Sequence, residues 1–244
     1  MPVAIVVGGA RRIGAAIVRG LADEGYDVGF TYHTSQSAAE KLSATLLAAG
    51  RKVSTARCDI TDPDALTHAL HELSSVLGHA HVVISCAGVF PPAAAVQDLT
   101  EQHMTEAFRA NTLPLLTIAR QYRLQCYEYQ QSGRIVVIGS LGAREIWRDR
   151  AAYNVSKAAL MTLAHSLARS LAPQISINTV APGAIAQPLE RRDTDSSLVD
   201  VSRIPMQRYG EAADVVDAVR YFARCSPYIT GQTIVVDGGY GLVR

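Results

Sequence analysis

The chain has 244 residues, a formal net charge of +1 and four cysteines. This length suits a single α/β domain with one substantial core, so we predict one domain over residues 1–244. The charge is nearly balanced and forms no basic stripe, so we expect neither nucleic acid nor a membrane as a partner. The cysteines lack metal-ligand spacing, and no signal peptide or membrane span is recognised. We therefore expect no metal and reduced thiols in a cytoplasmic protein.

Short β-branched runs alternate with longer segments of helical period along the chain. Strands are predicted at Val3–Val7, Asp27–Tyr32, Lys52–Arg57, His81–Cys86, Gly133–Gly139, Gln174–Val180 and Thr233–Val236. Helices are predicted at Arg12–Glu24, Ser37–Ala49, Pro63–Leu77, Glu101–Gln130, Arg150–Leu171 and Glu211–Arg224. Strands separated by helices form right-handed βαβ units, which predicts a doubly wound parallel sheet of about seven strands flanked by helices. Ligands of such sheets bind outside the carboxyl ends of the strands.

Pro114 interrupts the predicted helix 101–130. Proline has no N–H to donate, and its ring clashes with the carbonyl four residues back, so we expect a kink beside Asn111. Carbonyl groups freed by the kink can hold water. A bend that merely follows the sheet is the alternative explanation.

A glycine-rich turn, Gly8–Gly14, joins the first predicted strand to the first predicted helix. Such a turn lets a pyrophosphate approach the backbone and lie on the helix N-terminus, where free amides and the helix dipole favour an anion. A tight structural turn could have the same composition. The position between strand and helix favours a nucleotide-binding loop.

The end of the second predicted strand bears on the choice of cofactor. Sites that prefer NAD usually place Asp or Glu there to bind the ribose 2′-hydroxyl, yet no carboxylate follows Tyr32 until Glu40. Cations and hydroxyl groups suit a 2′-phosphate instead. The side chains expected around that phosphate are Arg11, Arg12, His33 and Ser35. The sequence therefore predicts NADPH rather than NADH.

Tyr153 and Lys157 are four residues apart in a predicted helix, so their side chains lie on the same face. An ammonium near a phenol favours the phenolate and lowers the phenol's pKa, which makes tyrosine a usable acid and base. By itself the spacing favours a surface pair on an amphipathic helix, because such pairs occur by chance in many helices.

Further motifs follow the strands in a fixed order. They are Asp59-Ile60, Ala87-Gly88, Asn111, Ser140 thirteen residues before Tyr153, Asn178, Pro182-Gly183 and Val236-Asp237-Gly238-Gly239. Together with the glycine loop and the Tyr153–Lys157 pair, they resemble the short-chain dehydrogenase/reductase family from Val3 to the C-terminus. The resemblance implies a single-domain, Rossmann-like fold.

The resemblance also implies the roles of individual residues. Tyr153 donates a proton to the substrate oxygen and Ser140 hydrogen-bonds that oxygen. Lys157 binds the nicotinamide ribose and lowers the pKa of Tyr153, while Asn111 holds a water linked to the proton supply. The implied cofactor contacts are Gly8, Arg12, Ile13 and Gly14 at the pyrophosphate, Asp59 and Ile60 at the adenine, Ala87 and Gly88 near the ribose, and Pro182, Gly183 and Ile185 at the nicotinamide.

Several positions depart from the family pattern. Val7 stands where a threonine is usual, Arg12 replaces the middle glycine of the loop, Ser85-Cys86 replace two asparagines, and Gln187 replaces a threonine. These departures bear on loop rigidity and cofactor contacts, and they leave the four implied catalytic side chains in place.

The glycine loop with Arg12, the stretch Tyr32–Ser35 and the segment Val236–Tyr240 resemble pteridine reductases. Phe90 falls where that subgroup stacks an aromatic ring on the pterin. Pteridine reductases, however, usually carry aspartate where this chain has Ser140, and a serine hydroxyl suits a C=O group better than a C=N bond. We therefore favour NADPH-dependent reduction of a ketone or 3-oxo substrate, as in ketoreductases similar to 3-oxoacyl-carrier-protein reductases.

Two other functions remain as alternatives to a ketone reductase. Pteridine or dihydropteridine reduction is the nearer one. A non-catalytic regulator that senses NADP is disfavoured, because such a protein is expected to lose catalytic side chains that this chain retains.

The polar segment 184–205 lacks periodicity and is predicted to form a substrate lid. The side chains expected to line the substrate pocket are Phe90, Leu141, Arg144 and Trp147. Arg144, Arg148 and Arg150 either meet an acidic substrate or form a solvated basic face. The resemblance further implies a homo-oligomer, a tetramer or a dimer, built through the helices around 101–130 and 150–171 and the C-terminal segment.

Overall fold

The computed structural model describes residues 1–186 and 199–242. A seven-stranded parallel sheet forms its centre, with the strand order β3-β2-β1-β4-β5-β6-β7. The strands are β1 (Val3–Val7), β2 (Asp27–Tyr32), β3 (Val53–Arg57), β4 (Val82–Ser85), β5 (Gly133–Ile138), β6 (Ile175–Pro182) and β7 (Thr233–Val236). The predicted doubly wound sheet is confirmed, with strand ends shifted by at most two residues from those expected.

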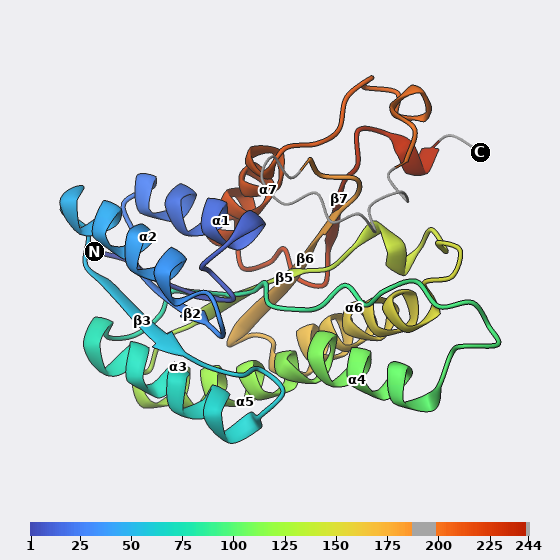
Figure 1. Cartoon of the computed structure of the whole chain (residues 1–244). Coiled ribbons are helices and arrows are strands. Elements are labelled where there is room, and N and C mark those ends of the chain that lie inside the picture. The colour runs from blue at the N-terminus through green and yellow to red at the C-terminus, as the bar shows by residue number, and fades with distance from the viewer. Residues whose placement is uncertain (187–198, 243–244) are drawn as a thin grey trace.

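Helices cover both faces of the sheet (Figure 1). One layer contains α1 (Arg12–Asp23), α2 (Gln36–Ala48) and α7 (Ala212–Arg224). The other contains α3 (Pro63–Leu77), α4 (Glu101–Asn111), α5 (Leu113–Glu128) and α6 (Ala151–Leu171). Among the described residues, no helix combines the length and the apolar character needed to cross a membrane.

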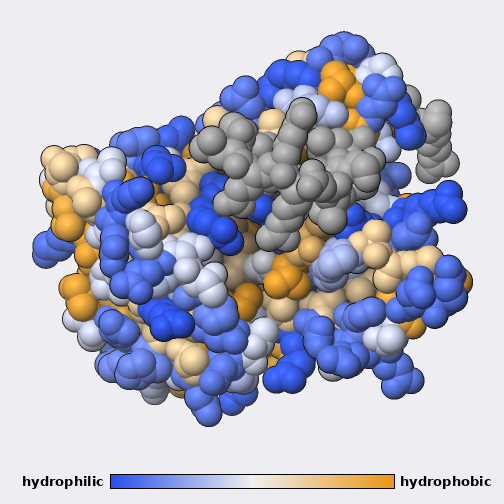
Figure 2. Space-filling view, in the orientation of Figure 1, coloured by the Kyte–Doolittle hydropathy of each residue, from blue (hydrophilic) through white to orange (hydrophobic). Residues whose placement is uncertain are grey.

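Each face of the sheet has its own hydrophobic core. Along β1, Ala4 and Val6 point into the core under α1, α2 and α7, whereas Val3, Ile5 and Val7 point into the core under α3, α5 and α6. Successive side chains of a strand alternate between faces, and both faces are covered, so β1 is apolar throughout. The outer surface is different: hydrophilic residues predominate on the face shown in Figure 2.

The predicted long helix 101–130 is divided into α4 and α5 at Thr112. Because Pro114 has no N–H, the carbonyl of Ala110 lacks its usual helical partner, and Leu115 N donates to Thr112 O at 3.3 Å. Thr112 Oγ1 donates to Ser156 O at 2.8 Å and fixes the break against α6. The expected kink is correctly placed beside Asn111, but the helix is interrupted there instead of bending continuously.

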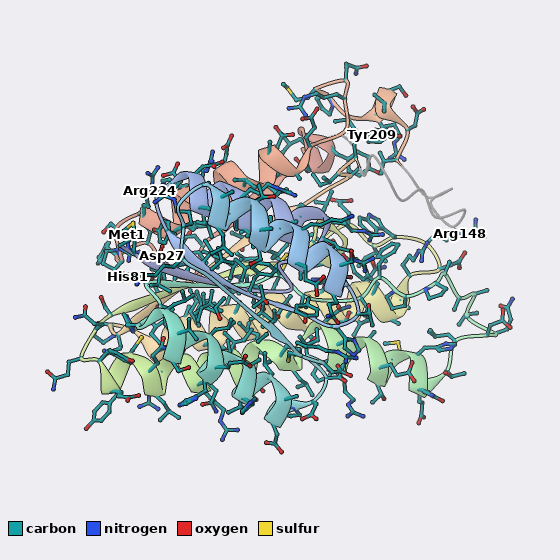
Figure 3. The ribbon with its side chains drawn as sticks, turned by 60° about the vertical axis from the view of Figure 1, so that its left-hand side comes forward. Met1, Asp27, His81, Arg148, Tyr209 and Arg224 are labelled. Carbon is teal, nitrogen blue, oxygen red and sulfur yellow. The ribbon has the colours of Figure 1, made fainter. Side chains whose placement is uncertain are left out.

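The carboxyl ends of β1 and β4 form the switch point of the sheet. The chain leaves β1 for α1 on one face and leaves β4 for α4 on the other, which opens a crevice between the two connections. Ala87 N donates to Val7 O at 2.8 Å, so the start of the loop after β4 lies beside the glycine loop. Figure 3 places Asp27 and His81 together at the amino ends of the strands, with Arg148 and Tyr209 at the opposite end.

Candidate active site

The glycine loop packs too closely for side chains at two of its positions. A Cβ on Gly8, whose φ is +86°, would lie 2.7 Å from Ala87 Cα, and a Cβ on Gly14 would lie 2.0 Å from Gly8 O. Gly8 N donates to Thr31 Oγ1 at 2.9 Å, which ties the loop to β2. Thr31 was not among the predicted site residues, because its role depends on the pairing of β1 with β2.

This loop fits the pyrophosphate of a dinucleotide. The first turn of α1 carries no acidic side chain, and Arg11 at the N-cap makes no side-chain capping bond, so backbone amides there suit an anion. Arg12 has a φ of +52°, in the left-handed region that favours glycine. The conformation of the family's glycine is thus kept at this position despite the substitution by arginine.

The predicted 2′-phosphate and adenine residues come together at the ends of β2 and β3. His33 Nε2 lies 3.9 Å from Asp59 Oδ2. Asp59 Oδ1 accepts hydrogen bonds from Thr61 N at 2.9 Å and Thr61 Oγ1 at 2.8 Å, and these bonds lower the pKa of the Asp59 carboxyl. Ser35 is the N-cap residue of α2 but its hydroxyl does not cap the helix. The His33 imidazole thus lies beside the Asp59 carboxyl, and Ser35 follows two residues later at the start of α2.

The four predicted catalytic side chains come from three elements. Ser140 follows β5, Tyr153 and Lys157 lie in the first two turns of α6, and Asn111 ends α4. Ser140 is buried, and its Oγ accepts a hydrogen bond from Gly142 N at 3.1 Å. The Ser140 hydroxyl also acts on the phenol of Tyr153, whose pKa it lowers.

Burial controls the protonation of Tyr153 and Lys157. Burial raises the pKa of Tyr153, and the hydrogen bond with Ser140 only partly opposes this. Burial lowers the pKa of Lys157 to about 8, and its ammonium donates to Ile138 O at 3.1 Å. Lys157 is not among the groups that shift the pKa of Tyr153, and the net shift is opposite to the one expected from the pair, because desolvation of the phenolate is its largest cause.

The side chain of Asn111 is hydrogen-bonded to protein groups. Nδ2 donates to Val89 O at 3.0 Å and to Ser156 Oγ at 2.9 Å, while Oδ1 accepts from Val89 N at 2.7 Å. Ser156 Oγ in turn donates to Tyr153 O at 2.8 Å. Oδ1 keeps a second lone pair that can accept from a water, so the predicted water at Asn111 stays a prediction. Ser156 was missed from sequence, although it lies inside the Tyr153–Lys157 motif.

Two aromatic side chains predicted for the substrate pocket surround the ring of Tyr153. The Phe90 ring meets it edge-on, with centroids 4.6 Å apart, and the Trp147 ring stacks on it at 5.7 Å and 11°. Leu141, also predicted here, is buried in the 3₁₀ turn that follows Ser140. Arg144 is the C-cap residue of that turn. Its side chain is exposed, so the structure does not show it lining the predicted substrate pocket.

The three arginines near this site differ in their surroundings. Arg144 and Arg148 are exposed, as a solvated face requires. Arg150 is only 5% exposed, and its Nη1 donates to Pro91 O at 2.6 Å. The solvated-face alternative therefore fails for Arg150, whereas its contact with an acidic substrate stays a prediction, because Arg150 lines a cavity that also reaches Tyr153.

The predicted lid and the nicotinamide residues follow β6. A Cβ on Gly183 would lie 2.7 Å from Asp237 Cβ, so the end of β6 approaches β7 closely. Ile185 forms a parallel bridge with Gly210. Residues 187–198 of the lid, including Gln187, lie outside the described residues. The remaining cofactor residues Ile13, Ile60, Ala87, Gly88 and Pro182 lie at the carboxyl edge of the sheet, as predicted.

Known proteins resemble the chain along nearly its whole length. The family model described as enoyl-(acyl carrier protein) reductase matches residues 8–241. The 3-oxoacyl-acyl-carrier-protein reductase MabA of Mycobacterium avium is 33% identical over 241 residues, covering 98% of this chain and 89% of that protein.

Solved structures agree with this result. A short-chain dehydrogenase/reductase from Serratia marcescens has 31% identity and a TM-score of 0.88, with 98% of this chain and 97% of that chain covered. A short-chain dehydrogenase from Burkholderia cenocepacia in complex with NADP has 30% identity and a TM-score of 0.87, with 98% of each chain covered. The chain therefore belongs to the short-chain dehydrogenase/reductase family, whose members are nicotinamide-dependent oxidoreductases acting on C=O and CH–OH groups.

Proposed function

We propose that this protein reduces a ketone or 3-oxo substrate to the alcohol with NADPH. The observation that carries the proposal is that the buried hydroxyl of Ser140, at the end of β5, lies close enough to the Tyr153 hydroxyl to lower the pKa of that phenol, against the larger effect of burial. Two neutral hydroxyl donors suit a carbonyl oxygen that gains negative charge during reduction. The relatives named 3-oxoacyl-acyl-carrier-protein reductases support the same substrate class.

In this proposal the protein supplies the proton and stabilises the charge on the substrate oxygen. Bound NADPH supplies the hydride. Tyr153 donates its hydroxyl proton to the substrate oxygen, and Ser140 turns its O–H from Tyr153 toward that oxygen while Gly142 N–H holds its Oγ in place. The raised pKa of Tyr153 keeps the phenol protonated near neutral pH, and a protonated phenol is the form that reduction requires.

NADPH is favoured by the residues at the rim of β2. His33 and Ser35 border the region where a ribose 2′-phosphate would lie, and Arg11 and Arg12 begin α1 beside it. A carboxylate at the end of β2, which would repel that phosphate, is missing from the described segment 30–39. The residues expected to hold the pyrophosphate are the backbone groups of the glycine loop.

One experiment tests the mechanism, the substrate and the cofactor together. The parent protein and the variants Tyr153→Phe, Ser140→Ala and Ser140→Asp are assayed with NADPH and NADH against 3-oxo esters and thioesters and against dihydrobiopterin. We expect ketone reduction in the parent, with kcat/KM higher for NADPH than for NADH. Tyr153→Phe should abolish turnover while NADPH still binds, and both Ser140 variants should lose ketone reduction by a factor of about 100 or more.

Four results would contradict the proposal. Pterin turnover in the parent without ketone reduction would support the pteridine reductase alternative, which the position of Phe90 beside Tyr153 also permits. A kcat/KM ratio for NADPH over NADH below one would overturn the cofactor assignment. Unchanged turnover in Tyr153→Phe would overturn the mechanism, and binding of NADPH without any turnover would leave a cofactor-sensing role.

We also propose that the protein acts as a homo-oligomer. Helices α4, α5 and α6 expose large apolar side chains that a second copy could cover. These are Phe108, Leu113, Leu116 and Val155.

A further inference from the structure

Arg150 is a buried cation at the first turn of α6, outside the group of residues that perform the proposed chemistry. Burying a guanidinium is costly unless its N–H groups find partners. Nη1 donates to Pro91 O at 2.6 Å, and the guanidinium carbon lies 4.4 Å from the centroid of the Phe90 ring. Both contacts are made to the same loop, the one that follows β4.

That loop has few other attachments beside the catalytic tyrosine. Asn111 fixes its beginning at Val89, and Ala94 N donates to Asp149 O at 2.9 Å farther along. Between these two points the loop borders a cavity of about 110 Å³ that also reaches Tyr153. The cavity is lined by Pro91, Pro92, Ala93, Ala94, Leu99, His103, Asp149, Arg150, Ala152 and Tyr153. The cavity leaves a gap in the packing under this part of the loop, and Arg150 reaches from the start of α6 to the carbonyl group of Pro91.

Phe90 lies between Arg150 and the ring of Tyr153 and contacts both. Its ring packs against the guanidinium on one side and meets the Tyr153 ring edge-on, with centroids 4.6 Å apart. Phe90 also contacts Trp147 at 6.1 Å, and Trp147 stacks on Tyr153. The three aromatic rings thus form one packed group, which we call the aromatic cluster, and Arg150 holds its outer member.

We propose that Arg150 is a positioning residue that holds Phe90 against Tyr153 and so sets the width of the substrate pocket beside the reacting oxygen. The inference rests on the proposed ketone reduction, because only then does the space beside Tyr153 receive a substrate. Arg150 acts through Phe90 and does not touch the substrate. Its loss should therefore weaken substrate binding more than it slows proton transfer.

The central variant is Arg150→Met, which keeps the apolar stem but loses the hydrogen bond and the charge. Arg148→Met is the matched control, since Arg148 is two residues away and its side chain is 95% exposed at the edge of the molecule (Figure 3). Arg150→Lys keeps a charge and a donor without the planar group, and it replaces the Met variant if that protein does not fold. Phe90→Leu and the double variant Phe90→Leu/Arg150→Met complete a double-mutant cycle, which measures the coupling between Phe90 and Arg150.

Trp147 offers a readout that needs no substrate, because it is the only tryptophan of the chain. We expect Arg150→Met to shift Trp147 emission to the red and to raise its acrylamide quenching about twofold, since the indole loses packed neighbours. Arg148→Met should leave both unchanged. Equal emission and quenching in the two variants would overturn the proposal, whether or not the protein proves to reduce ketones.

The kinetic readout separates positioning from a general loss of structure. We expect Arg150→Met to raise KM for the ketone about tenfold, equivalent to about 1.4 kcal/mol, with kcat and NADPH affinity within about threefold of the parent. In the Phe90→Leu background, the same change should raise KM less than about twofold, because the residue that Arg150 positions is gone. Additive effects of the two substitutions would refute the role of Arg150. A parent without ketone reductase activity would refute the proposed function and leave the fluorescence test standing.

Discussion

Replacement of Lys157 by methionine should make the protein more stable while abolishing its activity. Lys157 is buried, and the desolvation of its ammonium lowers its pKa from an ordinary 10.5 to about 8. At neutral pH the folded state therefore contains a buried positive charge, which lowers the free energy of unfolding. Methionine has a similar shape and no charge, so the substitution removes that penalty together with the ammonium that the proposed reaction needs.

The magnitude follows from the pKa difference. At about 1.4 kcal/mol per pKa unit, a fall from 10.5 to about 8 corresponds to about 3 kcal/mol of unfavourable free energy in the folded state. Loss of the hydrogen bond to Ile138 O opposes this by about 1 kcal/mol. The Lys157→Met variant should therefore be more stable by about 2 kcal/mol at pH 7, which raises Tm by about 4–8 °C in a domain of this size.

The pH dependence gives the sharper test. Below pH 8 the lysine is protonated in both the folded and the unfolded state, so the full penalty is present. Between pH 8 and about 10.5 the folded state loses its proton first, and the penalty declines as pH rises. The stability advantage of Lys157→Met should therefore be largest at pH 7, disappear near pH 10, where the remaining penalty equals the roughly 1 kcal/mol lost with the hydrogen bond, and reverse at higher pH.

Thermal unfolding of the parent and the variant at pH 7, 9 and 10 measures this advantage, and NADPH oxidation assays measure activity. Lys41→Met serves as the control, because Lys41 is exposed on α2. Its effect on Tm should be small at every pH. A Lys157→Met protein that is less stable than the parent at pH 7, or whose advantage does not change with pH, would refute the reasoning from burial.

Two further substitutions test the supports of the site. Gly14→Ala places a Cβ 2.0 Å from Gly8 O, so the loop must move, and NADPH affinity measured by titration should fall about tenfold or more. An unchanged affinity would show that the glycine loop does not bind the pyrophosphate. Ser156→Ala removes the bridge from Asn111 to the backbone of the catalytic turn, and kcat should fall about tenfold with NADPH affinity preserved. Ser166→Ala, an exposed position of the same helix, should behave like the parent, and an equal loss in both variants would argue against the bridge.

The sequence was sufficient for the elements whose signals are local. Strands such as β1 are continuous runs of buried apolar residues, so their positions follow from the pattern itself. The break at Thr112 was visible because Pro114 lacks a donor wherever it stands. The strands and the glycine loop were recognised from such local patterns, so most of the predicted cofactor residues were correctly expected at the carboxyl edge of the sheet.

The features that escaped sequence analysis depend on contacts between distant parts of the chain. Arg150 is buried because Pro91, 59 residues earlier, offers a carbonyl group to it. The amide group of Asn111 is hydrogen-bonded to the backbone of Val89, 22 residues away, which spacing along the chain does not indicate. The direction of the pKa of Tyr153 was missed because spacing on a helix indicates a neighbouring charge but does not indicate how deeply the ring is buried.

The same burial explains how the site can favour reduction. The raised pKa of Tyr153 and the lowered pKa of Lys157 both favour the neutral forms of these groups, so the pocket disfavours phenolate formation before the substrate arrives. Oxidation of an alcohol would need the phenolate as a base, whereas reduction of a ketone uses the neutral phenol as an acid. Ser140 strengthens this bias because its hydroxyl can donate to a developing alkoxide. A pocket that keeps Tyr153 protonated and places the Ser140 hydroxyl near it is therefore suited to deliver a proton in the proposed reduction.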